Sequence, residues 1–531
     1  MDNWFPLINF THYSLLKGFS KPSELVEKCK QNNYPACGIC DFKTISGAVS
    51  FYKSCKDANI KPIIGCAFDD FVVFAKNKDG WHDLIALVSS LDDDDKLDTS
   101  TANKIIAKNN LVKLTKDDIK KSPVSYYTNK EQANLHRVLL CSHLKTTLPK
   151  VMKQIKKDPV LRDDNGMDLS QYFISDKFYV LSADESKGLD ISLAKKLYEQ
   201  CEDYNILSKP NLPEFSCPNN KSEEDYLKEL CRIGWKNLLQ SAGKVEKEDD
   251  KNKYLNRFKI EFDVIKNANL FGYFLIVKDI IRYAESKGWL CGPGRGSAAG
   301  CLISYLIGIT KIDPVEYDLL FERFYNAGRN SEDRVSLPDI DMDFPGNHRD
   351  DIIEYLKNKY GHDNVSQMIT FGRLQGRSAL KEVLRVNEAC SFAEMNAITK
   401  SVPNEAEISD QLAEMDDDER SIIRWALINR AEDLQDFCSL NEEGKLDGNY
   451  AEFFQQAIDL EGTFKTQGKH AAGVVISKAK LSTVCPMVKP RGDGEKIAGL
   501  EMSDLEALGH VKFDVLGITL LDKLMYIKEL V

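Results

Sequence analysis

The order of hydrophobic and polar residues divides the chain into segments of different character. Residues 1–210 alternate short apolar runs, such as "KPIIGCAF" and "DLIALVSS", with stretches of helical periodicity such as "SELVEKCKQNNYP". This rhythm predicts one domain of alternating strands and helices. The interval 207–226, rich in proline and asparagine, is typical of a linker, and Ser222 followed by two glutamates predicts the start of the next helix.

Beyond this linker, apolar residues recur mainly at helical spacing. Phe274, Val277, Ile281 and Ala284 share one helix face in a segment that ends at Gly288. The stretches "RSIIRWALINRAEDLQDF" and "YAEFFQQAIDLEG" are amphipathic, and their aromatic residues predict core packing rather than a nucleotide-binding platform. The chain is therefore predicted to carry a helical insertion between two α/β pieces.

The strongest period-two pattern is "SLPDIDMDF", in which Asp339, Asp341 and Asp343 alternate with apolar residues. It predicts a β-strand with one apolar face and one face that carries three carboxylates roughly 6 to 7 Å apart. Such carboxylates repel one another unless solvent or a cation offsets their charge, which suggests a hard divalent metal such as Mg²⁺. The alternative is an acidic edge strand that its charge keeps soluble.

A glycine-rich loop, "CGPGRGSAAG", precedes the acidic strand by about forty residues. Gly294 and Gly296, with Gly292, allow backbone N–H groups to face one concavity, which is a nest for phosphate oxygens. Arg295 supplies a fork-shaped cation, and Ser297 can cap the following helix, whose positive end would add to the anion site, or donate to the same phosphate. In the alternative interpretation, the glycines serve only a tight turn and close packing.

A triphosphate loop and a metal-binding carboxylate set together suggest nucleotidyl transfer, in which two cations serve the attacking hydroxyl and the leaving pyrophosphate. Such a site needs a third carboxylate, and Asp514 in "HVKFDVLG" is the best candidate. Lys512 lies two residues earlier, on the same strand face, and could contact a phosphate. Taken alone, Asp514 would be read as a capping or salt-bridged aspartate.

Basic residues follow the acidic strand. Spacing of i, i+4 puts Arg373, Arg377, Lys381 and Arg385 on one helix face, which suits a nucleic-acid backbone but is equally the pattern of a solvated face. In "TQGKHAAGVVIS", Lys469 and His470 precede a buried-strand run. His470 could approach a phosphate or cap the strand.

The composition changes this picture little. The 531 residues, 43% hydrophobic with a net charge of −11, predict roughly three or four packed domains and require local basic patches or metals for any polyanion binding. Fourteen scattered cysteines predict reduced thiols. No signal pattern and no apolar run of bilayer length is found, so a cytoplasmic protein without a membrane partner is expected.

The ordered motifs resemble those of the C-family of replicative DNA polymerases, the bacterial DNA polymerase III α subunits. The stretches that carry the resemblance are "FGYFLIV", "GPGRGSAAG", "IDPVEYDLLFERF", "SLPDIDMDF", "YGHDNVSQMITFG", "GKHAAGVVI" and "VKFDVLG", with weaker matches in "THYSLLKG" and "GAVSFYKSCKDANIKPIIG". The resemblance implies a multidomain α/β protein, with a PHP-like α/β barrel domain and a nucleotidyltransferase-type, polymerase beta-like palm. The expected bounds are 1–210 for the PHP-like domain, 211–372 and 470–520 for the palm, 373–469 for a helical thumb, and 521–531 for the start of the fingers or a docking helix.

The resemblance also assigns roles. It makes Asp341, Asp343 and Asp514 the catalytic residues and the ligands of two Mg²⁺ ions, with Asp339 in support. Triphosphate binding is expected of the loop and of one lysine, at Gly294, Arg295, Gly296, Ser297 and Lys512. DNA binding is expected of Arg373, Arg377, Lys381, Arg385, Lys469 and His470.

Two departures from the family pattern are visible. The family's PHP metal site contains an H-x-H pair, a D-H pair and a glutamate, whereas this sequence has Ile8, Phe10, Phe42 and Ala67 at those positions and keeps only Asp41 and His82. Apolar side chains cannot ligate a metal, so no metal and no phosphoesterase activity are expected there.

The second departure is that the sequence given stops at Val531, where the family's fingers would follow. We therefore expect either a fragment or a split polymerase, perhaps of a phage-type system in an infected bacterium, whose second polypeptide supplies fingers and sliding-clamp contact. The expected docking surface on the last helix is Leu520, Leu521, Leu524, Ile527 and Leu530.

The function expected from these patterns is the catalytic part of a template-directed DNA polymerase that adds deoxynucleotides to a primer. The alternative is a non-catalytic DNA-binding scaffold that keeps the fold. A relic has no reason to keep like charges clustered, which favours the enzyme.

Overall fold

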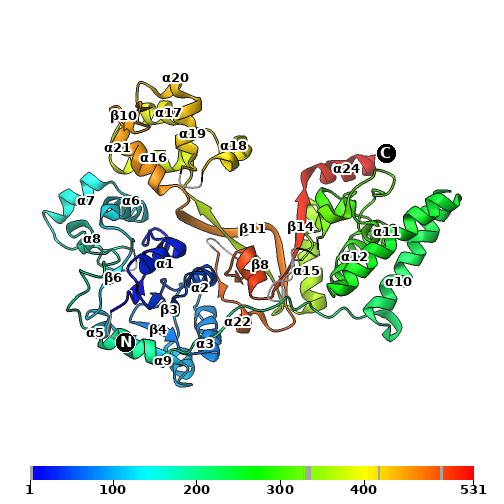
Figure 1. Ribbon diagram of the computed structural model, residues 1–531, viewed down its shortest axis with the longest axis horizontal. Coiled ribbons are helices and arrows are strands. Elements are labelled where there is room, and N and C mark those ends of the chain that lie inside the picture. Colours follow the sequence, from blue (N-terminus) through cyan, green and yellow to red (C-terminus); the bar gives the residue numbers. More distant parts are fainter. Residues whose placement is uncertain are drawn as a thin grey trace. The chain divides into compact units, whose positions relative to one another are not determined.

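The computed structural model describes residues 4–164, 166–326, 328, 337–416, 419–490 and 494–530. Ser336, the first residue of the acidic motif, and Val531, the end of the expected docking helix, lie outside the described residues. The chain divides into two compact units (Figure 1). The first unit contains residues 1–205 and 371–468, and the second contains residues 206–370 and 469–531.

The N-terminal part of the first unit is mixed α/β, as predicted. Its main sheet has the order β2-β3-β4-β5, in which β2 and β3 are parallel and the other pairs are antiparallel. A separate parallel pair joins β1 and β6. Because these described strands form open sheets, the predicted barrel is not confirmed. The strands are β1 (Ile8–Asn9), β2 (Ala36–Ile39), β3 (Lys61–Ala67), β4 (Phe71–Ala75), β5 (Leu111–Thr115) and β6 (Val124–Ser125).

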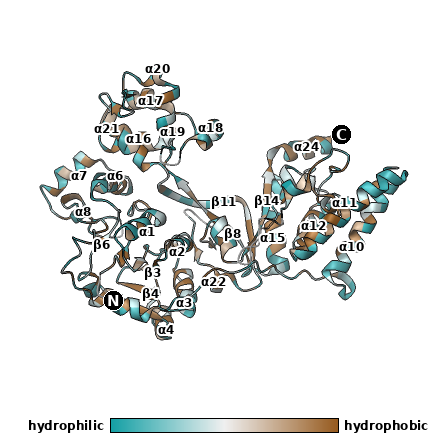
Figure 2. Ribbon diagram, in the orientation of Figure 1, coloured by the Kyte–Doolittle hydropathy of each residue, from teal (hydrophilic) through white to brown (hydrophobic). Residues whose placement is uncertain are grey.

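Helices cover these strands. Strands β3 and β4 are almost entirely buried, because helices and neighbouring strands shield both faces, and Figure 2 shows the hydrophobic character of β4. The helices are α1 (Pro22–Gln31), α2 (Ala48–Asp57), α3 (Lys78–Ser89), α4 (Thr99–Ile106), α5 (Lys116–Ile119), α6 (Ala133–His143), α7 (Leu148–Ile155), α8 (Ser170–Ile174) and α9 (Ser192–Gln200).

The helical segment of the first unit shares a hydrophobic core with α6. Leu380, Phe454 and Leu139 are fully buried in it, and Trp425 and Phe453 pack against it, so the predicted core role of these aromatics is confirmed. The elements are α16 (Gly376–Val386), α17 (Phe392–Lys400), α18 (Ser409–Glu414), α19 (Ile422–Asn429), α20 (Ala431–Leu434), β9 (Ser439–Leu440), β10 (Leu446–Asp447) and α21 (Ala451–Leu460).

The second unit is built on a sheet of order β12-β13-β8-β11-β14-β7. Its central strands, β8 and β11, extend past the unit boundary into residues of the first unit. Helix α12 contacts β7 and helix α15 contacts β14, and Figure 1 labels α12, α15 and β14 in this unit. The strands are β7 (Asp341–Pro345), β8 (Val365–Arg373), β11 (Phe464–Ile476), β12 (Met487–Val488), β13 (Ile497–Ala498) and β14 (Val511–Ile518).

Helices of the second unit follow the predicted periodicity. Ser222 caps α10 by accepting a hydrogen bond from the Asp225 N–H at 3.1 Å, and the apolar face of α12 is buried up to Ala284. Among the described residues, no helix is long and apolar enough to cross a membrane. The helices are α10 (Glu223–Gly234), α11 (Glu248–Asn267), α12 (Phe271–Ser286), α13 (Leu302–Leu306), α14 (Phe321–Phe324), α15 (Arg349–Tyr360), α22 (Leu481–Val484), α23 (Met502–Ala507) and α24 (Thr519–Leu530).

Candidate active site

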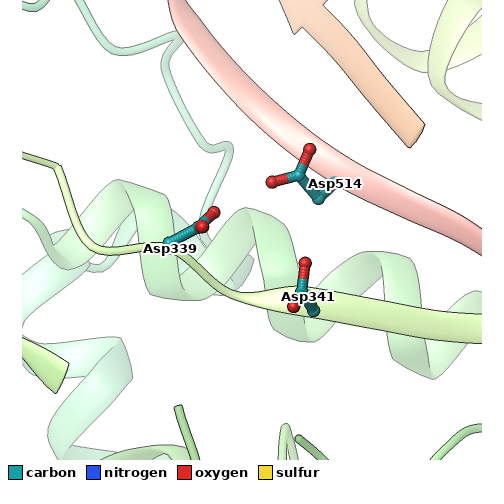
Figure 3. Close-up of side chains that lie close together, drawn as sticks. All are labelled: Asp339, Asp341 and Asp514. Atoms are coloured by element: carbon teal, nitrogen blue, oxygen red, sulfur yellow. The ribbon is translucent and has the colours of Figure 1, made fainter. Parts of the chain in front are cut away.

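Two neighbouring parallel strands bring the predicted acids together. Strands β7 and β14 pair with Asp341 directly opposite Asp514. Met342 and Phe344 are buried, so the predicted apolar face of the acidic strand is confirmed. One carboxylate oxygen from each of Asp339, Asp341 and Asp514 lies within 4.8 Å of the other two, and Figure 3 shows the three side chains pointing toward one another. We call these three residues the palm cluster.

Lys512 supplies the cation that this cluster holds in the structure. Its ammonium donates to Asp514 Oδ2 at 2.6 Å and to Asp339 Oδ1 at 2.9 Å. The prediction that Lys512 shares a strand face with Asp514 is therefore confirmed. Its ammonium contacts carboxylates, however, and is the internal counterion of the palm cluster.

The electrostatics of the palm cluster reflect crowding of like charge. Burial raises the pKa of Asp514 to about 6, and the adjacent Asp339 adds to the rise while Lys512 opposes it. Burial also works to raise the pKa of Asp339, but hydrogen bonds from Asp514 and Lys512 outweigh it and hold this pKa below its ordinary value. Close packing of the two carboxyls thus raises the pKa of Asp514 and leaves that of Asp339 low.

Asp343 lies on the same strand but outside the palm cluster. Its Oδ1 is 3.2 Å from Arg295 Nε, an ion-pair distance without hydrogen-bond geometry, and Arg295 Nε is also 3.5 Å from Asp341 Oδ2. Burial raises the pKa of Asp343, Arg295 acts against the rise and Asp341 adds to it. Arg295 therefore connects the glycine loop to two of the predicted catalytic aspartates.

The glycine loop packs directly on the acidic strand. The Gly292 N–H donates to the Asp343 carbonyl at 2.9 Å, and a Cβ on Gly292 would lie 2.7 Å from the Asp343 Cβ. Gly294 has a φ of +94°, and a Cβ there would approach Thr310 Cγ2 to 2.7 Å. Glycine is thus required at these two positions by close approach and by backbone conformation.

The predicted helix terminus behind the loop is not available to a phosphate. Residues Gly296–Gly300 form a short 3-10 turn, and α13 begins only at Leu302, with Cys301 rather than Ser297 at its cap. The capping interpretation of Ser297 is therefore wrong. The expected contribution of the helix end is also wrong, because the first N–H groups of α13 donate to the buried Glu261 carboxylate.

Comparison with known families fits this geometry. A model described as the bacterial DNA polymerase III alpha NTPase domain matches residues 225–517, and a PHP domain model matches residues 9–156. The chain belongs to the bacterial DNA polymerase III alpha family. The first unit accordingly contains the PHP domain, and the second contains a polymerase-beta-like palm.

Individual family members align along nearly the whole chain. The DNA polymerase III subunit alpha of Aquifex aeolicus strain VF5 is 29% identical, and the match covers 98% of this chain and 52% of the relative. The subunit of Staphylococcus aureus strain Mu50 is 31% identical, with 96% and 46% covered, and that of Bacillus subtilis strain 168 is 30% identical, with 95% and 47% covered. The chain thus spans about half the length of the curated relatives it matches.

The residues of the predicted basic stripe on and before α16 differ in what their side chains contact. Arg377 donates to the carbonyls of Thr399 and Val402, at the end of α17, and Arg385 pairs with Glu382. Arg373 and Lys381 line a cavity of about 370 Å³ in the first unit, together with Arg377. Arg377 and Arg385 thus bond other groups of this chain, and Arg373, Arg377 and Lys381 border one cavity.

Lys469 and His470 lie at the start of the second-unit part of β11. His470 Nδ1 accepts the N–H groups of Ala472 at 3.2 Å and of Gly473 at 2.9 Å. Burial lowers the pKa of His470, and Lys512 and Arg349 lower it further. The neutral ring therefore caps its own strand through Nδ1, which is one of the two roles expected, and carries its proton on Nε2.

Asp41, which the resemblance places in the PHP metal site, is surrounded by hydrogen-bond donors of the protein. Asp41 accepts hydrogen bonds from the Thr11 N–H and Thr11 Oγ1, both at 2.6 Å, and from Ser14 Oγ at 2.7 Å. Phe10 stacks on Tyr126 with ring centroids 4.8 Å apart. We call Thr11, Ser14 and Asp41 the PHP corner.

Ile8, Phe42, Ala67 and His82 are the other described positions that the resemblance compares with the PHP metal site. Ile8 and Ala67 are buried, the Phe42 ring lies between the ammonium groups of Lys17 at 5.0 Å and Lys43 at 4.9 Å, and His82 is half-buried on α3. Hydrocarbon side chains thus stand at the four positions where the resemblance leads one to expect a metal ligand and the sequence differs, Ile8, Phe10, Phe42 and Ala67.

Sequence reasoning gave one residue of the palm cluster a lesser role and missed one pair of candidates. Asp339 was placed in support, although the period-two rule already put it on the face of Asp341, and it belongs to the palm cluster. Arg257 and Glu261, which hold the end of the glycine loop, were not singled out. Their i, i+4 spacing was a visible signal for an ion pair, but nothing in the sequence indicates which loop they hold.

Proposed function

We propose that this chain is the catalytic, palm-bearing part of a template-directed replicative DNA polymerase. It would add deoxynucleotides to a primer 3′ end by nucleotidyl transfer. The observation that carries this proposal is the convergence of three carboxylates from β14, from β7 and from the segment just before β7. Arg295 connects the glycine loop to the same acidic strand.

The donor set of the palm cluster suits a hard divalent cation. Its members offer only carboxylate oxygens, which are the ligands that Mg²⁺ prefers, and their repulsion is relieved by positive charge. We propose Asp341 and Asp514 as the metal ligands, together with Asp343 from the family pattern and Asp339 from the geometry. Two Mg²⁺ ions, when bound, would activate the primer hydroxyl and stabilise charge on the leaving pyrophosphate.

The glycine loop and Lys512 are proposed to hold the triphosphate. Gly294, Arg295, Gly296 and Ser297 present backbone N–H groups, a guanidinium and a hydroxyl along one short segment. A divalent cation at the palm cluster would replace Lys512 as counterion, which leaves the Lys512 ammonium for a phosphate oxygen.

DNA contacts are proposed for the basic residues around β8, α16 and β11. Arg373, Arg377 and Lys381 line one cavity, and Arg373 and Lys381 are the favoured phosphate ligands because the Arg377 guanidinium bonds the carbonyls of Thr399 and Val402. Arg377, Arg385 and His470 would act mainly by shaping the segments that carry them, because their hydrogen bonds and ion pairs are with other groups of this chain. Lys469 stays a proposed DNA contact. The PHP corner is proposed to be structural and to hold no metal.

We further propose a partner that supplies the fingers. Helix α24 exposes Leu520, Leu524 and Ile527 by 62%, 43% and 53%, and about half of each relative lies outside its match with this chain. These apolar side chains are suited to packing against fingers, whether in a second polypeptide or in a longer chain. Contact with a sliding clamp would come through that partner, in the cytoplasm of a bacterium or a phage-infected bacterium.

One observation favours a second candidate, a non-catalytic DNA-binding scaffold. Lys512 already neutralises part of the palm cluster, so the cluster could persist as a structural ion pair without turnover. The proposed enzyme requires that a divalent cation displaces this ammonium, whereas the scaffold does not.

Primer extension tests the proposal. The tagged chain is recovered from its native cells with whatever binds it and is given primed DNA, Mg²⁺ and four deoxynucleotides, with Asp341→Ala in parallel. We expect the wild-type complex to extend the primer and the Asp341→Ala complex not to extend it. A complex that contains a fingers-bearing chain, binds primed DNA and does not extend it would support the scaffold instead.

A further inference from the structure

The glycine loop is fastened at both of its ends. At its start, the Gly292 N–H donates to the Asp343 carbonyl and the Lys311 N–H donates to the Pro293 carbonyl at 2.7 Å. At its far end, the Gly300 carbonyl accepts from Arg257 Nη2 at 2.6 Å. Helix α11, about forty residues earlier in the chain, therefore fixes the point at which the loop passes into α13.

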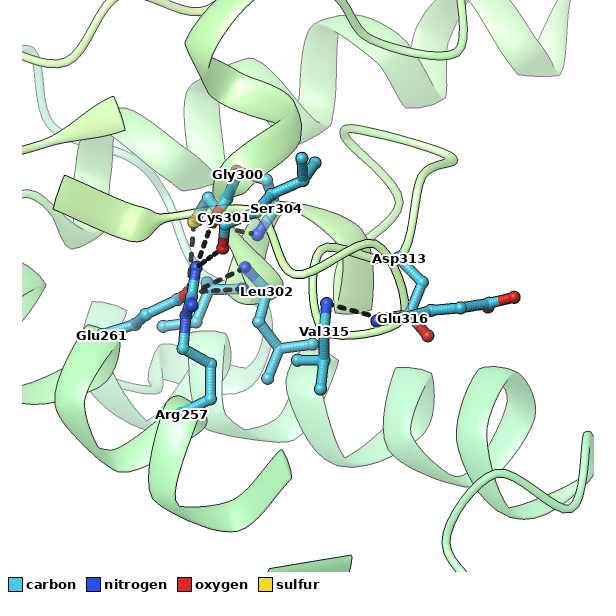
Figure 4. A network of polar contacts seen from close by, with 11 residues as sticks. Arg257, Glu261, Gly300, Cys301, Leu302, Ser304, Asp313, Val315 and Glu316 are labelled. Atoms are coloured by element: carbon cyan, nitrogen blue, oxygen red, sulfur yellow. Dashed lines mark hydrogen bonds and ion pairs between the residues drawn. The ribbon is translucent and has the colours of Figure 1, made fainter. Parts of the chain in front are cut away.

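Glu261 holds the backbone immediately after the loop. Its side chain is completely buried, and its carboxylate accepts the N–H groups of Leu302 and Ile303, each at 3.0 Å. The Cys301 thiol donates to Glu261 Oε2 at 3.4 Å. Figure 4 shows these bonds converging on one carboxylate, which thus acts as the cap of α13 from another helix.

Arg257 completes the arrangement. Its Nε donates to Glu261 Oε1 at 2.6 Å, while Nη2 reaches both Gly300 and the Leu319 carbonyl at 2.9 Å. One guanidinium therefore ties the loop end, the cap and the 310–320 segment together. That segment is also the one whose Thr310 packs against Gly294.

Stability alone does not account for this pair. A buried ion pair generally stabilises a fold no better than apolar residues of similar volume, because desolvation offsets the Coulomb attraction. What apolar residues cannot reproduce is the set of directed bonds to the Gly300 carbonyl and to the N–H groups of residues 302 and 303. The bonds fix geometry, and the geometry they fix is that of the loop.

We propose that Arg257 and Glu261 are positioning residues that set the shape of the glycine loop and thereby the affinity for the triphosphate of a deoxynucleotide. This inference rests on the proposed function. The pair does not belong to the palm cluster and has no direct part in the chemistry. It acts through residues 292–300, whose backbone must be held in one shape to receive phosphate oxygens.

Equilibrium binding of dATP with Mg²⁺ to the recovered complex tests this directly. Glu261→Gln loses the ion pair and one of the acceptors, and we expect the Kd for dATP to rise about tenfold because the loop is misplaced rather than removed. The Kd for primed DNA should stay within about twofold. In extension assays, the KM for deoxynucleotide should rise while kcat stays nearly unchanged.

Matched variants separate positioning from stability. Asp279→Asn breaks another buried acid, one that bonds Arg282, Tyr355 and Lys359 in the same unit without touching the loop. It should lower the melting temperature as Glu261→Gln does while leaving dATP affinity intact. The double variant Arg257→Met with Glu261→Met should regain stability yet keep the weak dATP binding.

Arg257→Lys covers the case in which Glu261→Gln fails to fold. A lysine keeps the charge opposite Glu261 but loses the fork that reaches Gly300, so amide exchange across residues 296–304 should accelerate. Wild-type dATP affinity in Glu261→Gln or in the double methionine variant would overturn the inference, as would unchanged exchange in Arg257→Lys. If the wild-type complex binds dATP but extends no primer, the proposed function fails while the positioning claim is still decided by the binding data.

Discussion

Two acidic sites in this chain have opposite surroundings. Asp41 of the PHP corner is enclosed by neutral donors from Thr11 and Ser14, which fill its carboxylate oxygens. In the palm cluster, Asp341 and Asp514 face each other across paired strands, with Asp339 beside them and Lys512 as counterion. Burial raises the pKa of Asp41 and of Asp514, so burial alone does not distinguish the two sites.

The two sites differ in whether their carboxylates still need a cation. A carboxylate whose oxygens accept several N–H and O–H groups is satisfied without metal, and a metal would have to displace those donors. Carboxylates that face one another are relieved by any cation, and a divalent ion does so better than one ammonium. The same residue type thus gives a structural corner in one unit and a candidate catalytic centre in the other.

The largest effect is expected from Asp341→Asn. Loss of one carboxylate from the palm cluster should reduce primer extension by the recovered complex more than roughly 100-fold, because the charge that would hold the metals is removed. Extension rates at saturating Mg²⁺ measure this. Retention of more than a tenth of the wild-type rate would remove the palm cluster from the catalytic account.

Asp41→Asn should act on stability instead. The amide keeps one acceptor but turns an NH₂ group toward the donors of Thr11 or Ser14, which should cost about 1 to 3 kcal/mol of unfolding free energy. Chemical denaturation measures the loss. A variant with the melting temperature of the wild type that bound fewer metal ions per chain, or lost extension activity, would contradict the structural role of Asp41.

Lys512→Met tests whether the ammonium competes with a divalent cation. Removing one positive charge next to the palm cluster should tighten Mn²⁺ binding by roughly tenfold, equivalent to about 1.4 kcal/mol, because the Coulomb repulsion of the ammonium is lost. Calorimetric titration gives this affinity, with Lys359→Met as control because Lys359 pairs with Asp279 in the same unit. Weaker dATP binding by Lys512→Met is expected too, and unchanged Mn²⁺ affinity would favour the scaffold.

The smallest effect concerns Glu382, an acid satisfied by side-chain cations. Burial works to raise its pKa, but bonds from Lys465, Ser142 and Arg385 hold it below the ordinary value. Its contribution to stability should therefore be complete above the unfolded pKa and disappear as pH falls through the folded pKa. Between pH 6 and pH 3, the unfolding free energy of the wild type falls as pH falls. In Glu382→Gln this slope should be smaller, by at most about 1.4 kcal/mol per pH unit. Identical slopes in both proteins would contradict this.

Sequence patterns predicted which face of a strand or helix a residue lies on better than they predicted which residue its side chain contacts. Alternation in "SLPDIDMDF" predicted the acidic strand and its buried apolar side, and period two correctly put Lys512 beside Asp514. The same rules could not show that Lys512 bonds Asp339, because the two lie 173 positions apart. Periodicity fixes the direction of a side chain on its own element, whereas its partner depends on how distant segments pack.

The errors have this origin as well. Ser297 was a reasonable cap candidate by its residue type, but the N–H groups of α13 are taken by Glu261, from a helix about forty residues earlier. Arg377 lies on the predicted helix face, yet its guanidinium bonds the carbonyls that end α17. In both cases a local rule predicted the element and a long-range contact decided the function of the residue.

The measurement that tests the account most directly is the number of Mn²⁺ ions bound per chain. Electron paramagnetic resonance would count them in the recovered complex with primed DNA and a nonhydrolysable deoxynucleotide, for the wild type, for Asp341→Asn with Asp514→Asn, and for Asp41→Asn. The account predicts that the double variant loses the bound ions and that Asp41→Asn keeps the wild-type number. Retention of all ions by the double variant, or their loss from Asp41→Asn, would contradict it.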